Sequence, residues 1–167
     1  TLLASGLIRD FSVAIDGGAH VGCWSDLMRE RFERVLAFEP SPAYANLLHN
    51  ARDWPNVECH NAALCDVKCR VESFSGKRRT MTSRLVRKVS QGGIPGRTVD
   101  SLKLDRCGLI KLDIEGWEYP ALLGALKTIR RTRPFVLVEL AGHGKRIGYG
   151  DQMVRDLLDR EGYDELF

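Results

Sequence analysis

Four acidic residues stand at the same kind of position, directly at the end of a short apolar segment: Asp16, Glu39, Asp113 and Glu139. Apolar segments of this length predict buried β-strands. If those strands are parallel, the four carboxylates lie along one edge of a sheet, which is where such sheets bind ligands. The negative charge collected there repels phosphate and suits a cation, hydroxyl groups or a hard metal ion.

A glycine-containing loop, Gly17-Gly-Ala-His-Val-Gly22, follows the first of these segments. It is one substitution from the dinucleotide fingerprint, and Glu39 lies at about the distance of the ribose-binding acid. A dinucleotide would place its pyrophosphate beside Asp16, so two negative groups would lie close together. S-adenosylmethionine carries an ammonium, a sulfonium and a ribose diol but no phosphate. We therefore favour this methyl donor, and an NAD-dependent oxidoreductase of Rossmann type is the alternative.

The donor's groups can be assigned to individual side chains. We expect Asp16 to meet the ammonium directly or through water, Glu39 to accept both ribose hydroxyls, and Asn61 to address the adenine. The glycines allow the backbone to approach the donor closely. The predicted donor-binding residues are Asp16, Gly18, Ala19, His20, Gly22, Glu39, Pro40, Asn61, Ala62 and Asp113.

A second set of residues could act on the acceptor, because an alcohol is a poor nucleophile that gains from a positioned base. His143 is the first candidate, oriented by Glu139 or Asp113, and a solvated loop histidine is an equally weighted interpretation. Asp113 and Glu115 could instead bind a divalent ion, although we predict no metal site, and Glu115 could serve only as charge at a helix N-terminus. The predicted catalytic residues are Asp113, Glu115, Glu139 and His143.

Other residues near these segments receive structural interpretations. Lys111 shares a strand face with Asp113 and is interpreted as an internal ion-pair partner of the strand-end acids. We expect His20 to make a loop contact, and Trp117 and Tyr119 to pack in the core, with lining of the acceptor pocket as the less favoured role.

The elements that must position these residues follow from hydrophobic periodicity. We expect one domain over 1–167, with strands at 12–16, 34–39, 57–60, 109–113 and 135–139 and short β pieces at 71–74 and 97–99. Helices are expected at 1–9, from Trp24 to Phe32, from Pro42 to Ala51, from Tyr119 to Ile129 and from Asp151 to Gly162, with a further strand beginning at 163–167. This order predicts an α/β fold with a mostly parallel sheet and helices on both faces.

The segment 77–97 contains seven Lys or Arg and no acid. We interpret 66–99 as an insertion or flap on the acceptor side, and a plain solvated loop is the alternative. Such a flap could hold an anionic acceptor, such as a phosphorylated or nucleotide-linked sugar. A nucleic-acid substrate is not favoured, because the segment lacks interleaved aromatic residues and the Lys-Asp-Lys-Glu tetrad of RNA ribose methyltransferases is not evident. The basic residues expected to fold over the site are Arg78, Arg79, Arg84 and Arg87.

The composition, with 44% hydrophobic and 28% charged residues, is that of an ordinary soluble domain, and no apolar run is long enough to cross a bilayer. The five cysteines include no C-x-x-C pair, so we predict reduced thiols in a cytoplasmic protein rather than disulfides or a zinc site. Because the first residue is Thr1 and no last strand is evident, a non-catalytic cofactor-binding module is a further alternative.

Several segments together resemble the FkbM-type methyltransferases. They are Asp16-Gly-Gly-Ala-His-Val-Gly22, Phe38-Glu-Pro40, Asn61-Ala-Ala-Leu64, Ile110-Lys-Leu-Asp-Ile-Glu-Gly116 with Glu118, Leu123-Gly-Ala125 and Val138-Glu139. The resemblance covers about residues 12 to 143, and the Lys-x-Asp-x-Glu-Gly run is its most specific part. It implies a class I methyltransferase fold, with the last strand absent or supplied otherwise. It also implies S-adenosylmethionine-dependent transfer to oxygen, on a sugar, a glycan or a small natural product.

Overall fold

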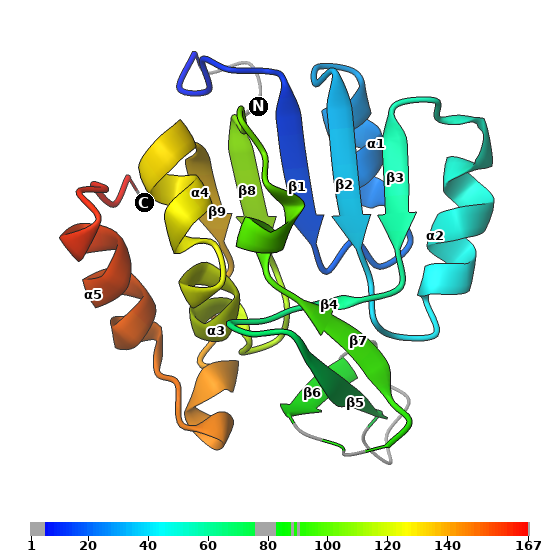
Figure 1. Ribbon diagram of the computed structural model, residues 1–167, viewed down its shortest axis with the longest axis vertical. Coiled ribbons are helices and arrows are strands. Elements are labelled where there is room, and N and C mark those ends of the chain that lie inside the picture. Colours follow the sequence, from blue (N-terminus) through cyan, green and yellow to red (C-terminus); the bar gives the residue numbers. More distant parts are fainter. Residues whose placement is uncertain (1–5, 76–82, 88, 90, 167) are drawn as a thin grey trace.

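The computed structural model describes residues 6–75, 83–87, 89 and 91–166. Its centre is a five-stranded parallel sheet with the order β3-β2-β1-β8-β9 (Figure 1). The strands are β1 (Val13–Gly17), β2 (Arg34–Phe38), β3 (Val57–His60), β8 (Leu109–Leu112) and β9 (Phe135–Val138). Each strand coincides closely with a segment that the apolar pattern predicts, so the α/β parallel architecture is confirmed.

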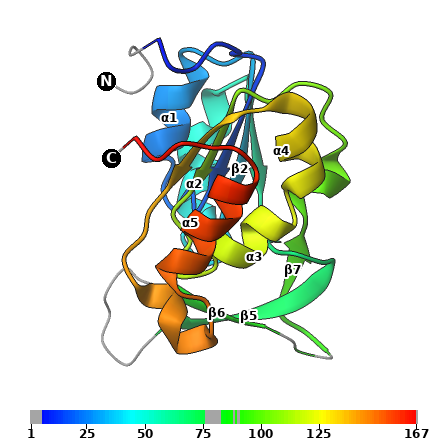
Figure 2. The same cartoon turned by 90° about the vertical axis from the view of Figure 1, so that its left-hand side faces the viewer.

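Helices cover both faces of this sheet (Figure 2). They are α1 (Cys23–Arg29), α2 (Tyr44–Asn50), α3 (Glu118–Leu123), α4 (Leu126–Thr132) and α5 (Asp151–Arg160). Side chains alternate between the two faces of a strand. In β1, therefore, Ala14 packs with Met28 of α1, whereas Ile15 belongs to the cluster that contains Leu122 and Leu157 of α3 and α5.

The helix after β8 differs from its prediction, because the single helix expected from Tyr119 to Ile129 is divided at Gly124 and Ala125 into α3 and α4. The carboxylate of Asp100 accepts hydrogen bonds from the N–H groups of Lys127 and Thr128 at 3.1 and 2.8 Å, and so caps a new helix. A Cβ atom on Gly124 would lie 1.9 Å from the carbonyl oxygen of Cys65. The break is therefore set by contacts with distant parts of the chain.

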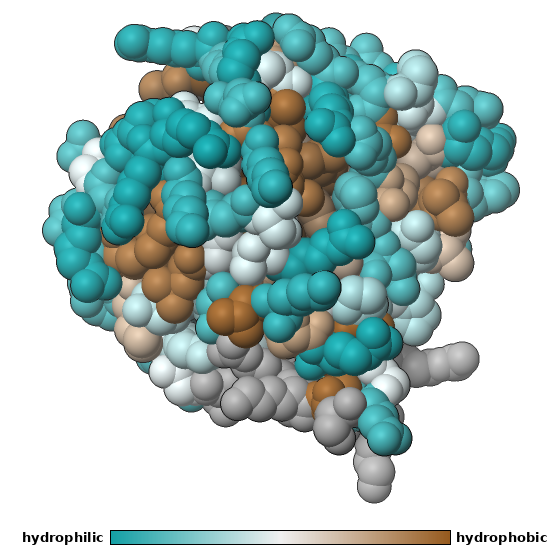
Figure 3. Space-filling view, in the orientation of Figure 1, coloured by the Kyte–Doolittle hydropathy of each residue, from teal (hydrophilic) through white to brown (hydrophobic). Residues whose placement is uncertain are grey.

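Smaller differences occur at the edges of the domain. Residues 6–9 are not helical and 163–166 form no strand, while 1–5 and 167 lie outside the described residues. Strand β9 was expected to be buried but is only partly buried, because within the described residues it pairs only with β8. Leu27 of α1 and Leu48 of α2 are exposed. Hydrophilic residues cover much of the face in Figure 3, and hydrophobic residues show between them in several separate places.

The segment after β3 forms a second sheet with the order β4-β7-β5-β6. Its strands are β4 (Ala63–Leu64), β5 (Cys69–Ser75), β6 (Ser83–Arg87) and β7 (Ile94–Arg97), and both views place it beyond the carboxyl ends of the parallel strands (Figures 1 and 2). The predicted piece at 97–99 is wrong in part, since Val99 begins the short helix η3 (Val99–Leu102).

Two of the four basic residues expected to fold over the site lie outside the residues that the structure describes. Arg78 and Arg79 lie outside the described residues. The backbone of Arg84 and Arg87 lies in β6, and their side chains are not described. Among the described residues, η2 (Ala51–Asp53) and η4 (His143–Ile147) are further short helices. In the described ranges, every helix is too short or too polar to cross a membrane.

Candidate active site at the carboxyl ends of the strands

The four strand-end acids lie on neighbouring parallel strands, as the sequence predicts. Asp16 is the penultimate residue of β1, and Glu39, Asp113 and Glu139 directly follow β2, β8 and β9. Because the strands run in the same direction and are adjacent, these residues share one edge of the sheet.

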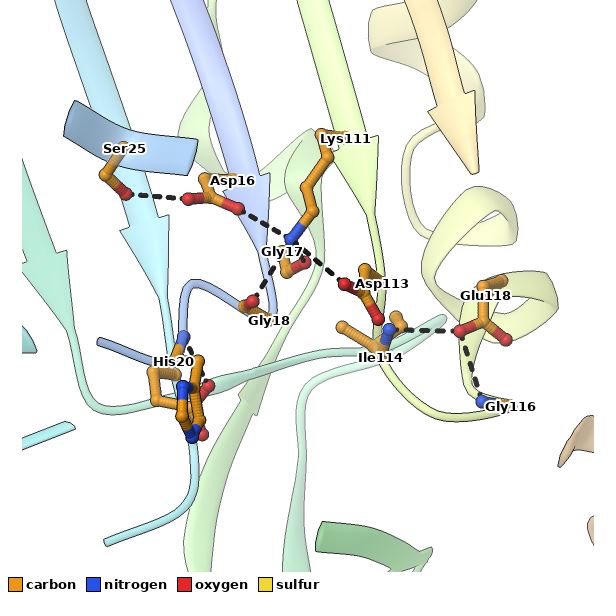
Figure 4. A network of polar contacts seen from close by, with 11 residues as sticks. Asp16, Gly17, Gly18, His20, Ser25, Lys111, Asp113, Ile114, Gly116 and Glu118 are labelled. Carbon is orange, nitrogen blue, oxygen red and sulfur yellow. Dashed lines mark hydrogen bonds and ion pairs between the residues drawn. The ribbon is translucent and has the colours of Figure 1, made fainter. Parts of the chain in front are cut away.

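On the β1 side of this edge, Lys111 joins several polar groups (Figure 4). Its Nζ atom lies 3.0 Å from Oδ1 of Asp16 and 3.7 Å from Oδ2 of Asp113, and it donates to the carbonyl oxygens of Gly17 and Gly18 at 3.2 and 3.1 Å. Ser25 of α1 donates to the other oxygen of Asp16 at 2.7 Å. Buried charges need such partners, and the prediction of Lys111 as an internal ion-pair partner is confirmed.

Asp16 is fully buried behind this network. One carboxylate oxygen accepts the Ser25 hydroxyl and the other faces Lys111. The direct contact with an ammonium group that the sequence suggests therefore lacks an exposed oxygen in this arrangement. Asp16 supports the glycine loop from inside, and its contact with a donor stays a prediction.

The glycine loop is held between β2 and β8. The N–H groups of Gly18 and Ala19 both donate to the carbonyl oxygen of Phe38 at 3.0 Å. Gly18 has φ +76°, and a Cβ atom there would lie 1.9 Å from the carbonyl oxygen of Asp113. Gly22, with φ +97°, lies immediately before α1. A side chain at Gly18 would therefore separate the loop from β8.

Glu39 is held beside this loop by backbone groups. Its Oε2 accepts the N–H of His20 at 2.9 Å, and its Oε1 accepts the N–H of Ser41 at 2.8 Å. A carboxylate has about four acceptor positions, so each oxygen keeps capacity for one more donor. The side-chain amide of Asn61 donates to the backbone carbonyl of Glu39 at 3.0 Å. His20 thus makes a loop contact, as expected, and it adopts a left-handed backbone with φ +52°.

Glu115 and His143 form the closest acid–histidine contact of the site, with 2.6 Å between Oε2 of Glu115 and Nδ1 of His143. The prediction that Glu139 or Asp113 orients His143 is therefore wrong. The turn after β8 brings Glu115 to the histidine instead. Glu115 has a left-handed backbone, with φ +57°, which is uncommon for a side chain of this kind. The His143 side chain is 36% exposed, so its ring is also open to solvent.

Asp113 and Glu139 form a carboxyl pair at the ends of β8 and β9. A hydrogen bond with Asp113 and repulsion from its charge raise the pKa of Glu139 from 4.5 to about 7, and nearby His143 acts in the opposite direction. Two of the predicted catalytic acids therefore lie in contact, and Asp113 favours the protonated form of Glu139.

Glu118 is a functional candidate to which the sequence analysis assigned no role. It is buried, and one carboxylate oxygen accepts the N–H groups of Ile114 and Gly116 at 3.0 and 3.1 Å (Figure 4). The sequence pattern that could have indicated a role for Glu118 is an acid that follows a glycine turn at the start of a helix with Pro120 in its first turn. Trp117 and Tyr119 pack against Tyr149, with ring centroids 6.2 and 5.5 Å away, which confirms their expected role.

A cavity of about 670 Å³ lies elsewhere, between β9, α5 and the segment 163–166. None of the predicted site residues lines it, so we do not assign the donor to this cavity. Across the parts of the chain that the structure describes, no three His, Cys, Asp or Glu side chains are arranged to hold a metal ion. A divalent ion bound by Asp113 and Glu115 would therefore have no third ligand of these residue types among the described residues.

Comparison with known structures supports the same fold. A methyltransferase FkbM from Methylobacillus flagellatus KT has 24% identity and a TM-score of 0.64, and the match covers 94% of this chain but 39% of that one. A precorrin-6y C5,15-methyltransferase from Geobacter metallireducens GS-15 has 15% identity and a TM-score of 0.52, covering 97% and 68% of the two chains. A Streptococcus mutans protein solved in complex with SAH has 13% identity and a TM-score of 0.52, covering 98% and 79%.

These likenesses show the α/β fold of class I methyltransferases. The chain spans about two fifths of the length of the Methylobacillus protein. No curated protein matches the sequence. The Methyltransferase FkbM domain, however, matches residues 16–165, which is most of the chain and includes the whole strand-end site. The chain therefore belongs to the FkbM methyltransferase domain family.

Proposed function

We propose that this domain binds S-adenosylmethionine and transfers its methyl group to an oxygen atom of an acceptor. The observation that carries the donor assignment is Glu39, whose two oxygens are fixed by the N–H groups of His20 and Ser41 and still have capacity for two hydroxyl groups. A ribose diol matches that arrangement. The close approach of Gly18 to β8 supports the same assignment, because it leaves the loop backbone rather than a side chain beside the strand ends.

The donor, when bound, supplies a methyl group already activated by a sulfonium. The chain's own contribution is alignment and proton removal, since an in-line displacement gains much of its rate from positioning. Lys111 and Asp16 hold the loop, and Glu39 would fix the ribose end. His143 is the candidate base. Because Nδ1 faces Glu115, the other ring nitrogen, Nε2, is left to accept the acceptor's hydroxyl proton, and the Glu115 carboxylate stabilises the resulting imidazolium.

Donor binding is tested by calorimetry with S-adenosylmethionine and its demethylated product. Glu39→Ala should weaken binding about tenfold or more, because it removes hydrogen bonds to a charged acceptor. Glu58→Ala is a matched control, since it removes an exposed strand glutamate paired with Arg34. Tight binding of NAD together with no binding of S-adenosylmethionine would favour the oxidoreductase alternative.

For the acceptor, we propose a hydroxyl of a sugar, glycan or small natural product. The basic segment 77–97 and the position of the small sheet beyond the strand ends support an anionic acceptor of this class. The five cysteines, all free in the structure, support a reducing, cytoplasmic location. A screen with labelled donor against sugars, nucleotide-sugars, small alcohols and RNA tests the acceptor. Donor binding without transfer to any of them would favour the non-catalytic module.

A further inference from the structure

Glu118 connects the turn after β8 to helix α3. Its side chain is 6% exposed, and a single oxygen accepts two backbone N–H groups, from Ile114 and Gly116. These two amides bracket Glu115 in the chain. A carboxylate oxygen that accepts both of them fixes the Asp113–Ile114 and Glu115–Gly116 peptide groups, and so restrains the backbone of the two residues between them, Ile114 and Glu115.

The bracketed turn has an unfavourable backbone. Glu115 and Gly116 both have positive φ, at +57° and +99°. A left-handed conformation is unfavourable for a non-glycine residue, so it persists where surrounding contacts determine it. The two hydrogen bonds to Glu118 are such contacts.

The same turn lies directly against the segment that carries His143. A Cβ atom on Gly116 would lie 2.6 Å from the backbone nitrogen of Gly144 and 2.7 Å from the carbonyl carbon of His143. This backbone contact, together with the left-handed Glu115, allows the 2.6 Å contact between Glu115 and Nδ1 of His143. A series of fixed contacts thus runs from Glu118 through the turn to the candidate base.

We infer that Glu118 is a positioning residue, which holds Glu115 in its left-handed conformation and thereby orients the imidazole of His143. This inference rests on the proposed function for its effect on turnover, but the orientation itself can be measured without turnover. What Glu118 must supply is a buried hydrogen-bond acceptor. Burial, opposed by its backbone hydrogen bonds and assisted by the charge of Asp113, raises the pKa of Glu118, so its negative charge is disfavoured at this position.

Two nearly isosteric variants separate the acceptor from the volume of the side chain. Glu118→Gln keeps an acceptor oxygen, and Glu118→Met keeps a similar volume without one. Nitrogen-15 spectra of the His143 ring report its tautomer in the donor-free protein. We expect the wild type and Glu118→Gln to show a single tautomer with the proton on Nδ1, and Glu118→Met to show a mixture.

Once an acceptor has been identified, Glu118→Met should lower kcat about tenfold, while the donor dissociation constant stays within about twofold of the wild-type value. The kcat of Glu118→Gln should stay near that of the wild type. Glu161→Ala is the matched control, because it removes a hydrogen-bonded glutamate at the end of α5. If Glu118→Met does not fold, Glu118→Asp withdraws the carboxylate from the two amides and should give the same mixture of tautomers.

A wild-type tautomer in both Glu118→Met and Glu118→Asp would overturn the inference. A changed tautomer with unchanged turnover would keep the positioning role of Glu118 and remove His143 as the base. The two failures are thereby distinguishable.

Discussion

The two halves of the strand-end edge hold their charges in different ways. On the β1 side, Asp16 and Lys111 are almost completely buried and paired within the fold. On the β9 side, Asp113, Glu139 and His143 are partly exposed, Glu115 has a left-handed backbone, and two carboxyl groups are in contact. The buried half has charges that the fold itself satisfies, whereas the exposed half keeps groups that can exchange protons with a ligand. The first arrangement suits a fixed binding loop, and the second suits chemistry.

The largest effect is expected from breaking the buried half. Lys111→Met leaves Asp16 with its charge uncompensated at zero exposure. Removing one partner of a buried ion pair typically lowers the free energy of unfolding by about 3–5 kcal/mol. Chemical denaturation measures this decrease. Adding Asp16→Asn to the Lys111→Met variant should restore part of the lost free energy of unfolding. A fully stable single variant would contradict the assignment of the buried half as a structural network.

On the exposed half, His143→Ala should lower turnover by about 10²-fold while donor affinity stays nearly unchanged, because the base acts on the acceptor. Steady-state kinetics together with calorimetry separate the two quantities. Glu115→Gln should show a smaller loss, since the imidazole keeps a hydrogen-bond partner but loses a stabilising charge. Wild-type turnover in the His143 variant would leave the Asp113–Glu139 pair as the candidate base.

The smallest expected effect is a dependence of stability on pH. Because the pKa of Glu139 is raised from 4.5 to about 7 in the folded protein, the folded state holds a proton that the unfolded chain releases. The contribution of Glu139 to the free energy of unfolding therefore falls as pH rises from about 4.5 to about 7, and is constant above that.

Glu139→Gln should remove this slope in denaturation experiments on the donor-free protein. Glu58→Gln is a useful control, because Arg34 lowers the pKa of Glu58 and its contribution is lost only as pH falls below the ordinary range of a glutamate. The same slope in wild type and Glu139→Gln would contradict the carboxyl pair.

The sequence predicts well those features that depend on the pattern of residues within a single segment. Apolar runs ending in acids identify the parallel strands, because burial on both faces requires continuous apolar residues. The strand ends then place Asp16, Glu39, Asp113 and Glu139 on one edge, and the pairing of Lys111 follows from the alternation of side chains. The FkbM resemblance rests on these same segments, and the family assignment confirms it.

The tertiary structure alone decided which of these groups meet. Glu115 pairs with His143 because Gly116 allows two backbone segments nearly thirty residues apart to approach, and that approach depends on how β8, β9 and their loops pack. The break between α3 and α4 depends on a cap from Asp100, which helical periodicity does not contain. Strand positions follow from free energies that each segment contributes by itself, whereas side-chain partners follow from contacts that exist only after the segments have packed together.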